Sequence, residues 1–461
     1  MKWKKMVASL LIGLMVISTV ACGSTNAKSD SGSAKSTESS VKKGDTSGKK
    51  KLVVWTLAKD LNQFGDKYKE KHPDVDVQTV VIEPADYPTK VKTAILGGAK
   101  EPDIIVGEPQ MLQDMYDAGL FEDLNKAPYN AQSYKDKIVN YVWDVGQDSK
   151  GIQRAISYQI TPAGIYYRRD IAQKVFGTDD PTEISKLFAD YKTILTTAQK
   201  LNDAGYKIFA SDGEMNYFSG DSAWVKGGKL NVDQARYDYM DLCVNLYKGD
   251  YTSYAAQWST PWYQGMAGPM PILKSDTNVW DTESLKKAEA SGQTTEVFAY
   301  GLPSWGVLTM RDNVKTTSGK WGVCSGPSNG FGGGTYIGIS SKSERKALAW
   351  DFLKFCTLDE DTSNWWIKAS QGDTVSLKSV LQAHADDKND VYGGEQMYKF
   401  WLEQANGIDY SKVTKYDKAI GDAWGTAISE IKTGQKSKND AISEFYDTVS
   451  STYPDIKVDR K

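Results

Sequence analysis

Residue types that commonly carry enzyme or metal chemistry are scarce in this chain of 461 residues. Only two histidines are present, His72 and His384, which excludes a His-rich metal site and leaves any Ser-His-Asp or Cys-His apparatus to one of them. Cys243, Cys324 and Cys356 lack C-x-x-C spacing, so they indicate buried thiols and support neither a zinc site nor a disulfide framework. The sequence therefore predicts no metal site and no cofactor.

Aromatic side chains, by contrast, are abundant, with 14 tryptophans and 26 tyrosines. The chain is 40% hydrophobic and 25% charged, an ordinary globular composition. Core packing is therefore the default explanation for any one tryptophan. Five tryptophans nevertheless cluster between residues 258 and 321: Trp258, Trp262, Trp280, Trp305 and Trp321.

The N-terminal residues predict secretion and a lipid anchor. Residues 1–21 combine three early lysines with a short apolar run and a small residue at the end, which is typical of a signal peptide. The following Cys22 is similar to the acylated cysteine of a bacterial lipobox, although Thr19 stands where that pattern usually has leucine. Residues 22–50 are rich in serine and lysine and lack aromatic residues, so we expect a flexible linker that reaches about 30 Å.

The charge balance argues against a nucleic-acid partner. The chain has 56 basic and 59 acidic residues, and nine of the lysines and three of the acids precede residue 51. The body therefore carries 47 basic and 56 acidic residues, a net charge of −9. A nucleic-acid-binding protein needs a positive surface, and this composition does not supply one.

Short apolar runs alternate with helical patterns along the body. The pattern predicts helices over 60–71, 90–96, 182–204 and 344–355, with a mostly helical chain from residue 359. It predicts strands over 51–55, 75–81, 102–106, 165–167, 296–299, 322–324 and 335–340. This alternation indicates an α/β fold with at least partly parallel sheets. Ligands of such sheets bind beyond the carboxyl ends of the strands, which directs attention to the residues after Val54 and Val106.

Four stretches together resemble extracellular solute-binding protein family 1, the sugar-binding lipoproteins of bacterial ABC importers that include maltose-binding protein. They are Lys51–Trp55; Pro102–Val106 with the run to Leu120; Tyr158–Asp170; and Gly332–Ser340 with the helix through Leu353. The resemblance implies a type II periplasmic-binding-protein fold, with mixed sheets in two hinge-connected lobes. It places the N-terminal lobe at 51–159 and 327–358 and the C-terminal lobe at 160–326 and 359–461.

The resemblance also implies what the protein does. We expect a monomer, anchored on the outer face of a Gram-positive cytoplasmic membrane, that binds an oligosaccharide and delivers it to the permease of an ABC importer. Catalytic residues are not expected. A sugar offers C–H faces that lie against aromatic rings and hydroxyls that require carboxylates or amides.

Candidate ligand contacts follow from the matched segments. The aromatic candidates are Trp305, after the strand ending near Ala299, Trp424 in a late helix, and Trp262. The polar candidates follow the first and third strands or lie at the first crossing between lobes: Lys59, Asp60, Glu108, Gln110, Tyr158 and Gln159. The glycine-rich segment around Gly333 offers backbone N–H groups and lacks the Lys-Ser/Thr of a phosphate loop.

Three other functions are compatible with the sequence. A secreted glycoside hydrolase would also have aromatic subsites, and the chain has enough carboxylates for one. A binding protein for peptides, polyamines or metal complexes, or a chemoreceptor-linked binding component, would look similar. The acidic run 386–390 lacks the spacing of an EF-hand and is interpreted as a solvated loop.

Overall fold

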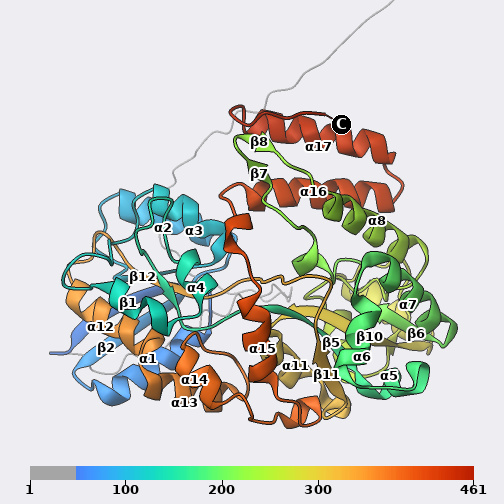
Figure 1. Ribbon diagram of the computed structural model, residues 1–461, viewed down its shortest axis with the longest axis horizontal. Helices are drawn as coiled ribbons and strands as arrows, with labels where there is room; N and C mark the ends of the chain where they lie inside the picture. The colour runs from blue at the N-terminus through green and yellow to red at the C-terminus, as the bar shows by residue number, and fades with distance from the viewer. Residues whose placement is uncertain (1–47, 461) are drawn as a thin grey trace, which may run out of the picture. The chain divides into compact units, whose positions relative to one another are not determined.

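The computed structural model describes residues 48–460. The predicted signal peptide, the lipidated Cys22 and nearly all of the predicted linker lie outside these residues. The described part contains two five-stranded mixed sheets flanked by helices. Figure 1 draws the first sheet among blue and cyan elements and the second among green and yellow ones.

The first sheet has the strand order β2-β1-β3-β12-β4. Its strands are β1 (Lys50–Thr56), β2 (Val75–Val81), β3 (Ile104–Gly107), β4 (Ile156–Ser157) and β12 (Tyr336–Ile339). Strand β1 runs parallel to β2 and β3, with Val54 opposite Ile104. Strand β12, which is more than 200 residues later, pairs antiparallel with β3 and places Ile337 opposite Val106. The carboxyl ends of β1 and β3 therefore lie at one edge of the sheet.

The second sheet has the strand order β11-β5-β10-β6, and β9 (Met270–Pro271) pairs with β10 outside this path. Its strands are β5 (Ala163–Arg168), β6 (Tyr206–Phe209), β10 (Thr294–Pro303) and β11 (Trp321–Cys324). Strand β10 is antiparallel to β5 and parallel to β6, which leaves β6 at the edge of the sheet. A small ribbon pairs β7 (Val225–Lys226) with β8 (Lys229–Leu230).

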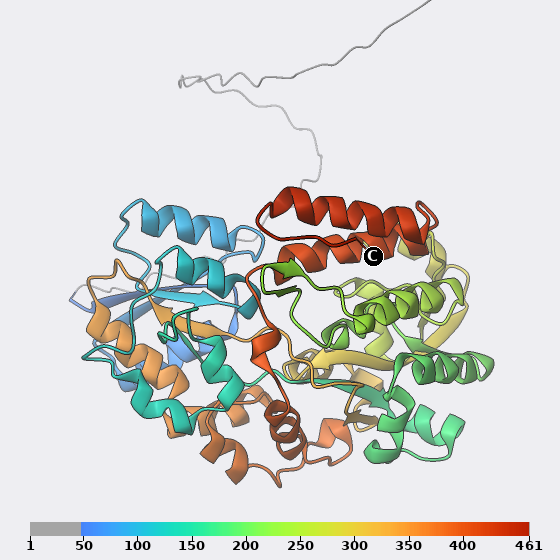
Figure 2. The same ribbon diagram turned by 45° about the horizontal axis from the view of Figure 1, so that its top comes forward.

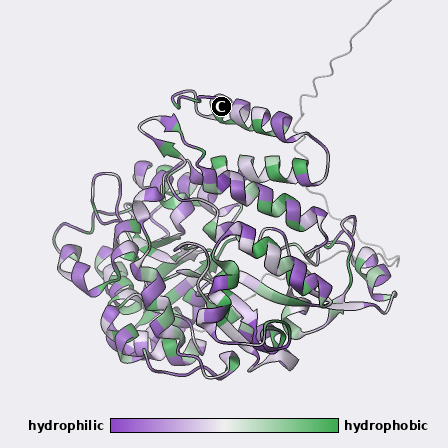
Figure 3. Cartoon of the chain, turned by 45° about the vertical axis from the view of Figure 1, so that its right-hand side comes forward, coloured by the Kyte–Doolittle hydropathy of each residue, from purple (hydrophilic) through white to green (hydrophobic). Residues whose placement is uncertain are grey.

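Helices cover both sheets and alternate hydrophobic with hydrophilic residues around their surfaces (Figure 3). In the first half of the described chain they are α1 (Asp60–Lys71), α2 (Tyr87–Leu96), α3 (Pro109–Asp117), α4 (Asn140–Val145), α5 (Arg169–Phe176), α6 (Pro181–Ser185), α7 (Tyr191–Asp203) and α8 (Gln234–Lys248). In the second half they are α9 (Thr260–Ala267), α10 (Thr282–Glu289), α11 (Gly306–Asn313), α12 (Lys346–Thr357), α13 (Glu360–Ser370), α14 (Lys378–Ala383), α15 (Met397–Asn406), α16 (Asp417–Lys432) and α17 (Lys438–Thr452).

The chain passes from one sheet to the other between β4 and β5 and again between β11 and β12. Helices α16 and α17 pack in the core around the second sheet, and the segment from α15 to α16 runs between the two halves in both views (Figures 1 and 2). Helix α13 packs on the first half, where Trp366 contacts Phe64. In the segment after α13, Thr374 donates a hydrogen bond to the carbonyl of Ile160, in the crossing between β4 and β5. The residue boundaries of the two lobes stay a prediction.

Most of the elements expected from local pattern are present with small shifts. Helix α1 and strand β2 have the predicted bounds, and the predicted helix over 182–204 is divided into α6, a 3₁₀ turn and α7. The three body cysteines are buried free thiols, as predicted. Within residues 48–460, no helix combines the length and the apolar character needed to cross a bilayer.

Candidate functional site

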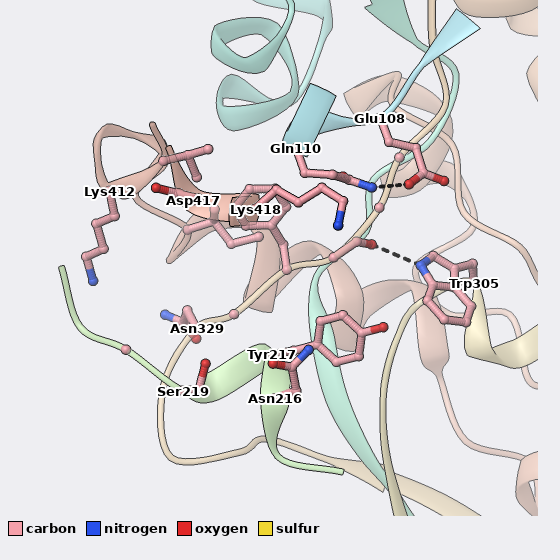
Figure 4. A pocket seen from close by; sticks show the side chains of 18 of the residues that line it. Glu108, Gln110, Asn216, Tyr217, Ser219, Trp305, Asn329, Lys412, Asp417 and Lys418 are labelled. Carbon is pink, nitrogen blue, oxygen red and sulfur yellow. Dashed lines mark hydrogen bonds between the residues drawn. The ribbon is translucent and has the colours of Figure 1, made fainter. Parts of the chain in front are cut away.

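The candidate site is a cleft of about 780 Å³, lined by residues that follow strands of both sheets and by the segment leading to α16. This volume lies in the range of ordinary small-molecule sites, roughly 300–1,000 Å³. Figure 4 shows Glu108 and Gln110 on one side of the opening and Asn216 and Tyr217 on the other. Segments that are far apart in the sequence therefore line a single cavity.

Two carboxylates enter the cleft from the first sheet. Glu108 directly follows β3. It is the N-cap residue of α3, which begins at Pro109, and its backbone is extended. The side chain of Gln110 donates a hydrogen bond to Glu108 (Figure 4), and burial raises the pKa of the Glu108 carboxyl. Asp60 begins α1 just after β1 and accepts a 3.1 Å hydrogen bond from the Tyr158 hydroxyl. Burial also raises the pKa of Asp60, which opposes the effect of this hydrogen bond.

A glycine-rich segment, residues 330–334, forms the wall between β11 and β12. Gly332 must lack a side chain, since a Cβ atom there would lie 2.2 Å from the ring of Tyr217. Gly333 has a φ of +69°, and its Cβ would meet the indole nitrogen of Trp305 at 3.3 Å. The backbone of this segment therefore approaches both aromatic side chains closely.

Trp305 is the half-buried aromatic centre of the cleft. It lies at the start of α11, where the chain turns after β10, and its indole Nε1 donates a 2.9 Å hydrogen bond to the carbonyl of Gly332 (Figure 4). Tyr217 meets it edge-on, with ring centroids 6.5 Å apart and an interplanar angle of 82°. Burial raises the pKa of the Tyr217 hydroxyl to about 12. A neutral tyrosine hydroxyl can both donate and accept a hydrogen bond.

The far end of the cleft carries basic groups. Arg236, in the first turn of α8, lies with its guanidinium carbon 3.8 Å from the centroid of Trp224 and donates a 2.6 Å hydrogen bond to Asp233. Burial lowers the pKa of Arg236 and raises the pKa of Asp417 on the opposite wall. Lys412 and other polar side chains complete this end.

Gln159 supplies an unused acceptor in the floor of the cleft. Its side chain is only 6% exposed, and its Oε1 atom has no hydrogen-bond partner among the described residues. A buried amide oxygen without a partner is unfavourable, so a ligand hydroxyl at this position would gain a hydrogen bond that the protein alone does not make.

The structure brings six of the ten predicted contact residues to the walls of this cleft: Asp60, Glu108, Gln110, Gln159, Trp305 and Gly333. The other four do not line it: Lys59, Tyr158, Trp262 and Trp424. Tyr158 is 2% exposed, and its hydroxyl donates a hydrogen bond to Asp60, which does line the cleft. Whether any of the ten touches a ligand stays a prediction.

The two remaining tryptophans are packed in the core. Trp262 has no exposed surface, and its Nε1 donates a 2.7 Å hydrogen bond to Glu214, whose pKa burial raises to about 7. Trp424 is 3% exposed and packs edge-on against Phe445, with centroids 4.8 Å apart.

Several cleft residues were not singled out from the sequence: Asn216, Tyr217, Trp224, Arg236, Trp258, Asn329, Lys412 and Asp417. Some lie in irregular loops, whereas Arg236 and Asp417 lie in the first turns of α8 and α16, and no local pattern distinguishes any of them. Of these residues, only Trp258 could be noticed in the sequence, as a member of the tryptophan cluster. Within residues 48–460, no group of three or more His, Cys, Asp or Glu side chains is placed to hold a metal ion.

A two-lobed α/β fold with a polar and aromatic cleft between its sheets defines the type II class of solute-binding proteins. The sequence profile of the bacterial extracellular solute-binding proteins matches residues 63–394, so the chain belongs to this family. No curated protein sequence matches the chain.

Solved structures share the fold at low sequence identity. An extracellular solute-binding protein of family 1 is 17% identical, with a TM-score of 0.70 over 87% of this chain and 99% of its own. The galacto-N-biose- and lacto-N-biose I-binding protein of an ABC transporter from Bifidobacterium longum is 16% identical, with a TM-score of 0.68 over 89% and 99%. The GacH receptor of Streptomyces glaucescens, studied with acarbose, is 14% identical, with a TM-score of 0.65 over 90% and 100%.

Proposed function

We propose that this protein is a substrate-binding lipoprotein that captures an oligosaccharide in its cleft and delivers it to the permease of an ABC importer. The observation that carries the proposal is the pairing, in one cavity, of the Trp305 ring with the hydrogen-bonding groups of Glu108, Asp60 and Gln159. An aromatic ring suits the C–H face of a sugar, and carboxylates and amides suit its hydroxyls. Structural neighbours that bind lacto-N-biose and acarbose support this ligand class.

Binding without catalysis is part of the proposal. A glycoside hydrolase uses two carboxyl groups on either side of the scissile bond, one as acid and the other as base or nucleophile. Here the Glu108 carboxylate accepts a hydrogen bond from Gln110, and Asp60 accepts one from Tyr158. Both acids are thus tied to neighbouring side chains, as expected for groups that hold hydroxyls in fixed directions.

A thermal-shift screen tests the ligand class. We expect lacto-N-biose, β-1,6-galactobiose, maltotriose or a related oligosaccharide to raise the melting temperature, because a ligand at 100 times its Kd adds about 2.7 kcal/mol to the free energy of unfolding. Spermidine and a tripeptide are the comparison ligands. A shift with either of these and none with sugars would contradict the carbohydrate assignment. Steady release of hydrolysis products from the bound sugar would contradict the binding-only function.

We also propose that Cys22 is acylated and holds the protein, as a monomer, on the outer face of a Gram-positive cytoplasmic membrane. The proposal rests on the signal-like residues 1–21 and the linker composition of residues 22–50. The Cys22→Ala variant is expected to move from the membrane fraction to the medium or to stay as unprocessed precursor. An unchanged, processed and membrane-bound variant would exclude this anchor.

A further inference from the structure

The loop between α8 and α9 contains an unusual concentration of backbone strain. Asp250, Tyr254 and Trp258 have positive φ angles of 56°, 55° and 71°, although none of them is glycine. Residues with a side chain adopt this region rarely, because the Cβ atom then lies too close to the backbone. Such angles persist only where the surrounding structure fixes them.

The same loop also contains buried hydroxyl groups without protein partners. The side-chain oxygens of these residues are buried and form no hydrogen bond within residues 48–460: Thr252, Ser253 and Ser259. Each of these residues is at most 2% exposed. Backbone strain and unpaired polar groups therefore occur together in one segment of ten residues, 250–259, which indicates that its conformation serves something other than stability.

Backbone hydrogen bonds fix the loop along the edge of the second sheet. Ile208 donates to the carbonyl of Tyr251 at 3.0 Å, and Ser253 donates in turn to the carbonyl of Phe209 at 3.1 Å. Ala255 continues the pattern with a 3.0 Å hydrogen bond to the carbonyl of Ala210. The loop thus extends the sheet beyond β6, and its last residues are held in a defined position.

The side chain that this loop presents is Trp258. It lines the cleft and is 44% exposed, although large aromatic side chains are mostly buried. Its ring is stacked on Trp305, with centroids 5.7 Å apart and an interplanar angle of 27°. Its other neighbour, Trp262, lies 5.0 Å away and is itself held by Glu214. Trp258 therefore packs against two rings whose indole nitrogens are hydrogen-bonded, and part of its surface stays exposed in the cleft.

We propose that Trp258 is the outer half of a two-tryptophan ligand platform, and that the strained loop exists to hold it in place before the ligand arrives. The inference rests on the proposed function, since it assigns the sugar-binding role within the same cleft. A platform formed in advance loses little conformational entropy on binding, which favours affinity. It selects pyranose rings whose C–H groups gather on one face, because only these cover the indole surface.

Binding measurements on four proteins test the platform. The probe is the sugar that stabilises the wild-type chain in the thermal-shift screen, and calorimetry measures its Kd. We expect Trp258→Ala to raise this Kd about tenfold or more, and Trp258→Phe to keep it within about threefold of the wild-type value. The matched control is Trp280→Ala, because Trp280 is 66% exposed and does not line the cleft. Unchanged or tighter binding by Trp258→Ala would overturn the inference, and tighter binding would mean that Trp258 only covers Trp305.

Stability measurements test the strain separately. Glycine tolerates a positive φ angle, so Trp258→Gly is expected to melt roughly 1 °C or more above Trp258→Ala, while both variants bind sugar equally weakly. If Trp258→Ala melts at the same temperature as Trp258→Gly, the claim that the loop is strained at residue 258 is wrong. If the wild-type chain binds none of lacto-N-biose, β-1,6-galactobiose and maltotriose, the carbohydrate function fails together with the platform. If the wild-type chain binds one of these sugars and Trp258→Ala binds it equally well, the platform proposal fails and the carbohydrate function stands.

Discussion

Trp305→Ala is expected to weaken oligosaccharide binding about 30-fold, which corresponds to a loss of about 2 kcal/mol. Trp305 is half-buried at the centre of the cleft and is fixed by the hydrogen bond from its Nε1 to Gly332. Truncation removes the ring face that a sugar would cover and also frees the glycine-rich wall against which it lies. Both effects act on the bound state more than on the fold, because Trp305 is not among the fully buried side chains of the core.

Titration calorimetry of three proteins separates these contributions. Trp305→Phe keeps an aromatic face but loses the donor to Gly332, so its affinity is expected to fall between those of the wild type and Trp305→Ala. Circular dichroism and the melting temperature report whether the fold is retained. If the alanine variant binds the same sugar as tightly as the wild type, Trp305 is not a ligand contact, even if the cleft is the binding site.

Local sequence pattern was sufficient for many of the elements. Asp60–Lys71 and Val75–Val81 form the helix and strand expected of them, because apolar spacing, charge and the flanking residues all agree there. The pattern could not reveal that Ile337 lies opposite Val106, since strand pairing over such a distance depends on the whole fold. The resemblance to a known family assigned both segments to one lobe and did not specify their pairing.

The candidate site was predictable where it follows strands and not where it depends on loops. Glu108 and Asp60 follow β3 and β1, and the rule that ligands bind beyond strand ends led to them directly. Trp262 and Trp305 are the same residue type, yet one is fully buried and the other lines the cleft. Only the tertiary structure distinguishes them, since each is part of an apolar and glycine-containing segment. Tyr217 lies in a single 3₁₀ turn, Asn216–Phe218, which is too short for periodicity to offer information.

Asp103→Ala is expected to lower the free energy of unfolding by about 3–5 kcal/mol, the largest change in stability that we predict. Asp103 has no exposed surface and lies just before β3. Its carboxylate accepts hydrogen bonds from the backbone N–H of Val53 at 2.9 Å and from the Ser343 hydroxyl at 2.6 Å. The guanidinium of Arg345 lies 3.0 Å away. One buried charge thus connects β1 to Ser343, which is 240 residues after Asp103 in the chain.

Alanine would leave these three partners without their common acceptor, and the buried N–H of Val53 has no water to replace it in a closely packed sheet. Glu101→Ala is the matched control, because Glu101 also pairs with Arg345, at 3.2 Å, and with Lys51 at 2.9 Å. Its side chain is 35% exposed, so we expect its loss to cost about 1 kcal/mol or less. Urea denaturation of both variants measures the difference.

The comparison between the two acids tests whether burial determines the effect of a lost ion pair in this sheet. Asp103→Asn should fall between wild type and Asp103→Ala, because an amide oxygen can still accept from Val53 or Ser343 but carries no charge for Arg345. Equal midpoints for Asp103→Ala and Glu101→Ala would contradict this account. They would mean that the later segment is held to β1 and β3 by the pairing of β12 alone, and that the carboxylate of Asp103 adds nothing to it.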